Sequence, residues 1–189
     1  MHNLCTEYPN LSLRPIVSSI GTYNYQLANF LRDLLSPIIS SEFCSKDSFS
    51  FVKDVNQANI HGKYFVSYDV TRLYTNVPLQ ETIDIAVNLI LSNNVNFKIN
   101  KTDLKKLFIF TTSQSHFSFK KQNFDQTDGV AMGSPVAPVL ANLFMGHFEK
   151  KWLKSYNGVK PVFYRRYADD IFATFQSENN ACHFLGYIN

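Results

Sequence analysis

The stretch Tyr164-Arg165-Arg166-Tyr167-Ala168-Asp169-Asp170-Ile171-Phe172-Ala173-Thr174-Phe175 decides the fold. Aromatic and β-branched residues flank two adjacent carboxylates, which predicts a β-hairpin with Asp169 and Asp170 at its tip. Two neighbouring carboxylates repel each other, but a divalent cation such as Mg²⁺ binds carboxylate oxygens and offsets their charge. The hairpin is therefore a candidate metal site. The alternative is an ordinary solvated turn, because Asp is common in turns.

A third carboxylate ends another apolar run. The segment Tyr64-Phe65-Val66-Ser67-Tyr68-Asp69-Val70 is dense in β-forming residues and predicts a strand buried on both faces. An acid at the end of a buried strand is unfavourable unless a partner compensates its charge. Asp69 is thus a second candidate for the metal site. It could equally cap the turn that follows, and position alone does not separate the two interpretations.

The segment Gly129-Val130-Ala131-Met132-Gly133-Ser134-Pro135 predicts the start of a long helix that runs to about residue 156. Ser134 is a good N-cap and Pro135 suits the first helical position. Gly133 lets another backbone or a flat base approach the main chain closely. The alternative is an ordinary helix start with no ligand.

The remaining pattern predicts alternating helices and short strands. Before the first carboxylate strand we expect a strand at 13–17, a helix at 22–39 that Thr22 caps and Pro37 kinks or ends, and a loop with a possible short helix at 40–62. After it we expect a turn at 73–78 and helices at 78–92, capped by Asn76, and at 102–113. The pattern then predicts a strand at 116–121, a turn at 123–128 and, near the end of the sequence, a helix at 177–188 capped by Ser177.

Composition restricts the class of protein. The chain has 189 residues, 45% of them hydrophobic and 17% charged, which predicts one folded domain and excludes disorder. Cys5, Cys44 and Cys182 lack metal-ligand spacing, so we expect a reduced intracellular protein without a disulfide framework or zinc site. No apolar run reaches the ~20 residues of a membrane-spanning helix, and we expect no membrane partner.

Charge is unevenly distributed along the chain. Residues 98–166 contain 12 Lys and Arg against 4 Asp and Glu, whereas the remainder contains 6 against 11. A basic middle segment beside acidic flanks is typical of a protein that binds phosphates and keeps carboxylates for metal. The alternative is a set of solvated lysines on helix faces.

Taken together, these segments resemble the reverse transcriptases of Penelope-like retroelements. The resemblance is carried by Tyr68-Asp69-Val70-Thr71-Arg72-Leu73-Tyr74-Thr75-Asn76-Val77-Pro78, by residues 129–145 and by Arg166-Tyr167-Ala168-Asp169-Asp170, with Leu13-Arg14-Pro15-Ile16 before them. It covers nearly the whole chain. Arg72 and Ala168 depart from the residues usual in that group, but neither departure removes a carboxylate.

The resemblance implies an α+β palm-and-fingers polymerase fold, with a small antiparallel sheet backed by helices. It divides residues 1–189, one partial domain, into a finger-side segment at about 1–62 and a palm with helical insertions at 63–189. The thumb that such enzymes carry after the palm is absent from this sequence. We therefore expect a truncated copy with little activity alone.

The resemblance also implies roles for individual residues. Asp69, Asp169 and Asp170 would be catalytic, with Asp69, Asp169 and the Val70 carbonyl binding two Mg²⁺ ions, for which Mn²⁺ is a possible substitute. Asp170 would support the hairpin, since in a regular strand it points away from Asp169. Nucleotide-binding residues would be Arg14, Tyr74, Gly133 and Ser134, and primer–template contacts would come from Tyr167 and Pro135.

The implied function is RNA-directed DNA synthesis in a retroelement, with an RNA template, a DNA primer and deoxynucleoside triphosphates as partners, in the nucleus when active. Tyr74 would act as a gate against the ribose 2′-hydroxyl, although the pattern alone, without the resemblance, favours a core aromatic. Such a gate argues against the related alternative, an RNA-directed RNA polymerase. Another alternative is a remnant that binds nucleic acid without catalysis. The oligomeric state stays open.

Overall fold

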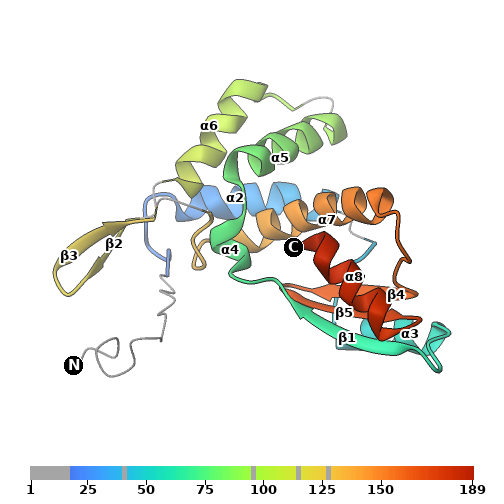
Figure 1. Cartoon of the computed structure of the whole chain (residues 1–189). Helices are drawn as coiled ribbons and strands as arrows, with labels where there is room; N and C mark the ends of the chain where they lie inside the picture. The colour runs from blue at the N-terminus through green and yellow to red at the C-terminus, as the bar shows by residue number, and fades with distance from the viewer. Residues whose placement is uncertain (1–17, 40–41, 95–96, 114–115, 127–128) are drawn as a thin grey trace.

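A three-stranded antiparallel sheet contains the predicted hairpin. In the computed structural model its strands follow the order β1-β5-β4, with β1 at Tyr64–Asp69, β4 at Phe163–Tyr167 and β5 at Asp170–Phe175 (Figure 1). The structure describes residues 18–39, 42–94, 97–113, 116–126 and 129–189. The expected strand at 13–17, with Arg14, lies outside these residues.

The hairpin prediction is confirmed. Tyr167 pairs with Asp170, so the turn consists of Ala168 and Asp169 alone. Ala168 has a φ of 52°, the left-handed conformation that tight hairpin turns require. Asp169 therefore lies in the turn, whereas Asp170 is already the first residue of β5.

The expectation that β1 is buried on both faces is wrong. Tyr64 and Phe65 are 39% and 53% exposed, and Ser67 and Asp69 are exposed as well. Within the described residues β1 lies at the end of the strand order and pairs only with β5. An edge strand has a neighbour on one side only, so apolar residues there stay accessible. Asp69 consequently does not carry the burial penalty that the sequence suggested.

Two helices cover opposite faces of the sheet. Helix α8 (Glu178–Ile188) packs Phe184 against Phe175 on one face, with ring centroids 5.4 Å apart. Helix α3 (Ser48–Gln57), the possible short helix of the 40–62 segment, places Phe51 edge-on to Phe172 on the other face. Its N-terminus is closed by a reciprocal capping box between Asp47 and Ser50.

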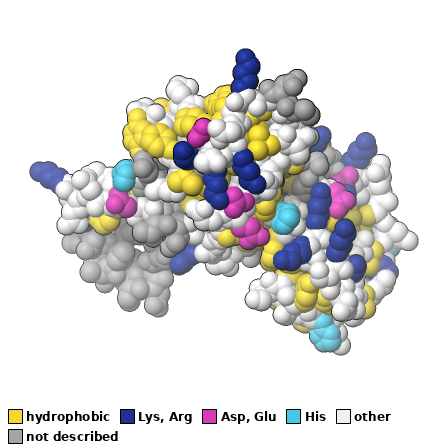
Figure 2. All heavy atoms as spheres, turned by 90° about the horizontal axis from the view of Figure 1, so that it is seen from above, with side chains coloured by type: hydrophobic (Ala, Val, Ile, Leu, Met, Phe, Trp, Pro, Cys, Tyr) yellow, Lys and Arg dark blue, Asp and Glu magenta, His cyan; other side chains and the backbone are white. Residues whose placement is uncertain are grey.

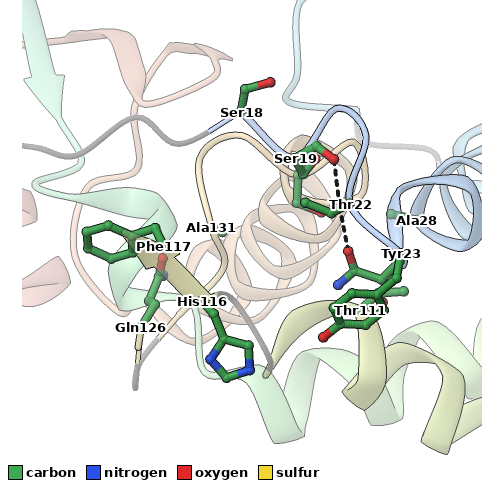
Figure 3. Close-up of a pocket in the computed structure, with 12 residues that line it drawn as sticks. Ser18, Ser19, Thr22, Tyr23, Ala28, Thr111, His116, Phe117, Gln126 and Ala131 are labelled. Carbon is green, nitrogen blue, oxygen red and sulfur yellow. Dashed lines mark hydrogen bonds between the residues drawn. The ribbon is translucent and has the colours of Figure 1, made fainter. Parts of the chain in front are cut away.

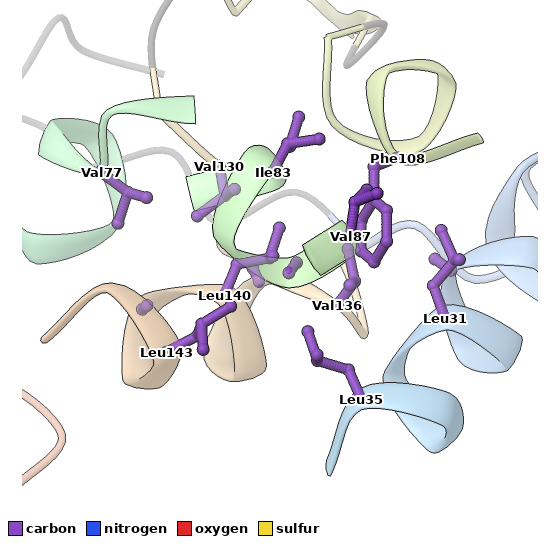
Figure 4. Close-up of a cluster of buried hydrophobic side chains, with 14 of the residues drawn as sticks. Leu31, Leu35, Val77, Ile83, Val87, Phe108, Val130, Val136, Leu140 and Leu143 are labelled. Carbon is purple, nitrogen blue, oxygen red and sulfur yellow. The ribbon is translucent and has the colours of Figure 1, made fainter. Parts of the chain in front are cut away.

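The other helices form a separate hydrophobic cluster. They are α2 (Tyr25–Leu35), the 3₁₀ helix η1 (Ser36–Ile38), α4 (Leu73–Asn76), α5 (Leu79–Asn93), α6 (Lys101–Thr112) and α7 (Ala137–Ser155). Leu31, Val87, Phe108 and Leu140, from α2, α5, α6 and α7, meet at its centre (Figure 4). Each of the four is fully buried.

A two-stranded hairpin projects from this helical part (Figure 1). It consists of β2 (His116–Phe119) and β3 (Gln122–Asp125). The turn expected at 123–128 is wrong over 123–125, which belong to β3, and residues 127–128 lie outside the described residues. The chain reverses earlier, at Lys120 and Lys121, which both have positive φ. Neither Lys120 nor Lys121 is a typical turn-forming residue, so the sequence composition predicted the turn too far along the chain.

Several helix ends differ from the sequence prediction. Helix α2 begins at Tyr25 and Thr22 does not cap it; the Thr22 hydroxyl donates to the Ser19 carbonyl instead. The 73–78 turn contains the short helix α4, and the Asn76 amide donates to the Thr71 carbonyl rather than capping α5. At the other end, the Ser177 hydroxyl accepts from the Asn180 N–H, which confirms the predicted cap of α8.

The start of α7 also lies later than predicted. The helix begins at Ala137, and Ser134 is not its N-cap. The Ser134 carbonyl accepts from the Ala137 N–H in a turn that precedes the helix. The segment contains a second proline, Pro138, which occupies the first helical turn, where Pro135 was expected from the sequence.

A buried ion pair fastens the hairpin to α7. The side chains of Arg166 and Glu149 are both 0% exposed, and Arg166 Nε donates to Glu149 Oε1 over 2.7 Å. The Tyr164 hydroxyl donates to the same oxygen over 3.0 Å. Burial raises the pKa of Glu149, while the Arg166 guanidinium and the Tyr164 hydroxyl act against that rise.

The same arginine also fixes the hairpin turn. Arg166 Nη1 donates to the Ala168 carbonyl over 2.9 Å and to Asn142 Oδ1 over 3.0 Å. Asn142 and Glu149 are two helical turns apart on α7 and therefore share one face. One guanidinium thus joins two points of the helix to the backbone of the turn that carries Asp169.

Replacement of Glu149 by Ala should lower the free energy of unfolding by about 3–5 kcal/mol, because Arg166 is left buried without its partner charge. Asp54→Ala is the matched control. This substitution breaks the ion pair between Asp54 and the adjacent arginine, Arg165, whose side chains are 32% and 28% exposed, respectively. It should lower the free energy of unfolding by about 1 kcal/mol or less. Urea unfolding of both variants measures the two changes in the free energy of unfolding. Equal changes would show that the buried ion pair contributes no more to stability than the partly exposed one.

Candidate active site

A cleft of about 700 Å³ lies beside the hairpin turn. The turn, α4, the first turns of α7 and the segment that follows η1 form its walls; the lining side chains include Lys46, Tyr74, Pro138, Asn142, Tyr167 and Ala168. Two of the predicted site residues, Tyr74 and Tyr167, are therefore brought together from positions far apart in the sequence.

The backbone positions of the three predicted acidic residues lie at one end of the sheet. Asp69 and Asp170 are paired in the antiparallel register of β1 and β5. The Val70 N–H donates to the Asp169 carbonyl over 2.9 Å, directly beside that pair. Because paired residues of antiparallel strands project to the same face, Asp69 and Asp170 share a face of the sheet. Asp169 is partly buried in the turn.

Tyr74 is coupled electrostatically to this acidic end. It belongs to α4, five residues after Asp69, and its side chain is half-buried. Burial raises the pKa of the Tyr74 hydroxyl, and the negative charge of Asp169 raises it further. The phenol is therefore neutral at physiological pH. Tyr167, in contrast, is 61% exposed at the rim of the cleft.

Gly129 holds the next segment against α4. Its φ is +65°, and a Cβ there would lie 2.3 Å from the Tyr74 carbonyl oxygen. The Val130 N–H donates to that same carbonyl over 2.8 Å. Only glycine permits this approach, so the loop before α7 is seated on the helix that carries Tyr74. The sequence analysis singled out Gly133 and gave no role to Gly129.

The predicted residues Gly133, Ser134 and Pro135 do not line the large cleft. Ser134 borders a smaller cavity of about 80 Å³ between the start of α2, the end of α6 and the β2–β3 hairpin (Figure 3). The Ser19 hydroxyl donates to the Gly133 carbonyl over 2.8 Å and fixes the loop there. Pro135 is partly buried in the same loop.

The sequence analysis missed two polar residues of the large cleft, Lys46 and Asn142. Asn142 interrupts the apolar run 139–144, and a polar residue inside such a run is a signal that a partner exists. Lys46 lies in an irregular segment, where no periodicity marks it.

The donor set suits a hard cation that is bound together with a substrate. Among the described residues, no group of three or more His, Cys, Asp and Glu side chains is arranged to hold a metal by itself. Magnesium in phosphoryl-transfer sites is typically bound by one or two carboxylates together with substrate phosphates. Adjacent carboxylates at an accessible sheet end fit that mode of binding.

Gly129→Ala should lower the free energy of unfolding by about 3 kcal/mol or more, because left-handed strain adds to a backbone clash with α4. Gly62→Ala is the matched control: its φ is +68°, but no atom lies within 4 Å of the added Cβ. The control should lose only about 1–2 kcal/mol of strain. Thermal unfolding distinguishes them, and equal losses would mean that contact with Tyr74 is unimportant.

Among the comparisons with known proteins, a family model gives a match over most of the chain. No curated protein matches the chain. No helix among the described residues has the length and apolar character needed to cross a bilayer. The family model described as reverse transcriptase (RNA-dependent DNA polymerase) matches residues 9–187. The chain therefore belongs to the reverse transcriptase family, the RNA-directed DNA polymerases.

Proposed function

We propose that the chain catalyses two-metal nucleotidyl transfer and belongs to the Penelope-like group of its family. Two observations support this most: the sheet register pairs Asp69 with Asp170, and the Val70 N–H donates to the Asp169 carbonyl, although 100 positions separate Asp69 from Asp169. Asp69, Asp169 and the Val70 carbonyl would hold the ions. Asp170, which is paired with Asp69 in the sheet, would support the hairpin without binding the ions.

The chemistry requires positioning and charge more than covalent participation. Two Mg²⁺ ions, when bound, would neutralise charge on the attacking 3′-hydroxyl and on the departing pyrophosphate. The task of the chain is then to position its carboxylates. Arg166 serves this task through its hydrogen bond to the Ala168 carbonyl in the turn.

The cleft would hold the incoming deoxynucleotide. Tyr74 would exclude a ribose 2′-hydroxyl, because it lines the cleft, where the charge of Asp169 also acts on its hydroxyl. Tyr167, exposed at the rim, would contact the primer end. Gly133 and Ser134 do not line this cleft, so we propose that they support the incoming base pair from outside it, through the loop before α7, and that Pro135 contacts the primer–template. Arg14 would bind the triphosphate or template, and synthesis would take place in the nucleus.

Asp69→Asn should reduce Mg²⁺-dependent primer extension by about a hundredfold or more, since a charged group at the reacting centre is lost. Mn²⁺ binding followed by electron paramagnetic resonance provides a readout that does not require turnover, and it should weaken in the same variant. Asp33→Asn, an exposed acid of α2, is the control and should change neither measurement. Unaltered Mn²⁺ binding by Asp69→Asn would refute the metal assignment.

Tyr74→Val should increase the incorporation of ribonucleotides relative to deoxynucleotides by about tenfold or more, because a steric block against the 2′-hydroxyl is removed. Incorporation of deoxynucleotides should change little. Competition between the two substrates on one RNA template measures the ratio. Tyr167→Val, at the rim of the same cleft, is the control and should leave the ratio unchanged. An unchanged ratio in Tyr74→Val would assign Tyr74 to packing.

A further inference from the structure

A basic groove lies at the end of α7 that is remote from the catalytic cleft. We propose that it binds the phosphate backbone of single-stranded RNA, as a second RNA contact beyond the proposed polymerase site. The groove has a volume of about 610 Å³. It runs between the C-terminal half of α7, the loop at 156–162 and the beginning of β4.

Both lysines and apolar side chains line this groove. Lys150 and Lys154 are four residues apart on α7 and therefore lie on one face, and Lys160 stands on the loop opposite. Dark blue side chains gather on the right of Figure 2, where Figure 1 places the C-terminal end of α7. Phe43 and Val162 line the interior, and Val162 is 43% exposed.

The positive charge of these lysines is not neutralised by their neighbours. Glu42 is the one acidic residue among the lining side chains. Arg165, the fourth basic residue, is paired with Asp54 at 2.7 Å. Within the described part of the chain, Lys150, Lys154 and Lys160 take part in none of the salt bridges, which leaves three ammonium groups available to an anion.

An extended polyanion fits this arrangement better than a single phosphate. The three lysines stand on two walls of an open groove instead of converging on one point. Proteins that bind single-stranded nucleic acid combine such a basic track with apolar surface for the bases. An enzyme of the reverse transcriptase family uses RNA as its template, so RNA is the polyanion it meets in every reaction cycle.

The groove is separate from the cleft but within reach of the same RNA molecule. Strand β4 runs from Phe163 at the groove to Tyr167 at the rim of the cleft, a rise of about 13 Å. RNA in the groove would therefore not occupy the nucleotide site. It would tether a region of the template beyond the part that is being copied.

The test compares two triple variants of the whole chain that lose the same charge. The groove variant carries Lys150→Gln, Lys154→Gln and Lys160→Gln. The control carries Lys53→Gln, Lys98→Gln and Lys101→Gln, all exposed lysines outside the groove. Fluorescence anisotropy of a single-stranded RNA of about 20 nucleotides, longer than the ~4–16 that one binding site covers, gives the affinity over a series of salt concentrations.

The groove variant should bind RNA at least about tenfold more weakly than the control at low salt, because it loses three phosphate contacts. The slope of log affinity against log salt should fall by about 2, at ~0.7 per contact, and Lys154→Gln alone should lower it by about 0.7. Gln at these exposed positions leaves the fold intact, which circular dichroism verifies. The proposed polymerase site is tested independently, since Asp69→Asn should leave this salt slope unchanged.

Equal losses in the two triple variants would overturn the proposal, because they would reflect net charge alone. Unchanged RNA binding by the groove variant would overturn it as well. Vesicles that contain phosphatidylserine test the other extended anionic surface. A groove variant that keeps its RNA affinity but loses vesicle binding would assign the groove to a membrane surface instead of RNA.

Discussion

The buried ion pair between Arg166 and Glu149 is the contact on which the acidic end of the sheet depends. Removing two charges from water is unfavourable, and the pair is tolerated because every polar atom of Arg166 that faces inward has a partner. In return the guanidinium joins α7 to the carbonyl of Ala168. An apolar pair of the same volume would fill the space but would leave that carbonyl, and hence the turn, without a fixed position.

A second constraint acts from the other side of the cleft. Gly129 brings the loop before α7 onto the backbone of Tyr74, so α4, the loop and α7 are held as one body. The hairpin turn and Tyr74 are thus both attached to α7, the turn through Arg166 and Tyr74 through the loop that contains Gly129. Their relative position is set by a single helix and not by the loops that carry them.

The elements most dependent on local pattern were predictable from the sequence. Aromatic residues on either side of Asp169 and Asp170 predict the hairpin. Ser177 marks the start of α8, because its side chain accepts a hydrogen bond from the Asn180 N–H, only three positions away. The exposure of Tyr64 and Phe65 was not predictable, since it depends on which strands are neighbours. The role of Glu149 was equally hidden: an acid near three lysines on a helix resembles a solvated surface, and only the partner 17 residues later explains its burial.

Helix α7 belongs to both hydrophobic clusters of the protein. Its first half contributes Leu140 and Leu143 to the helical cluster, whereas Leu153 packs against the cluster of the sheet and α8. Cooperative units of a protein open separately when they share few contacts. The amides in the middle of α7 lie between the two clusters, so their exchange with deuterated solvent reports the opening of both clusters together. Helices α6 and α8 each belong to one cluster, and their exchange reports the opening of the helical cluster and of the sheet cluster separately.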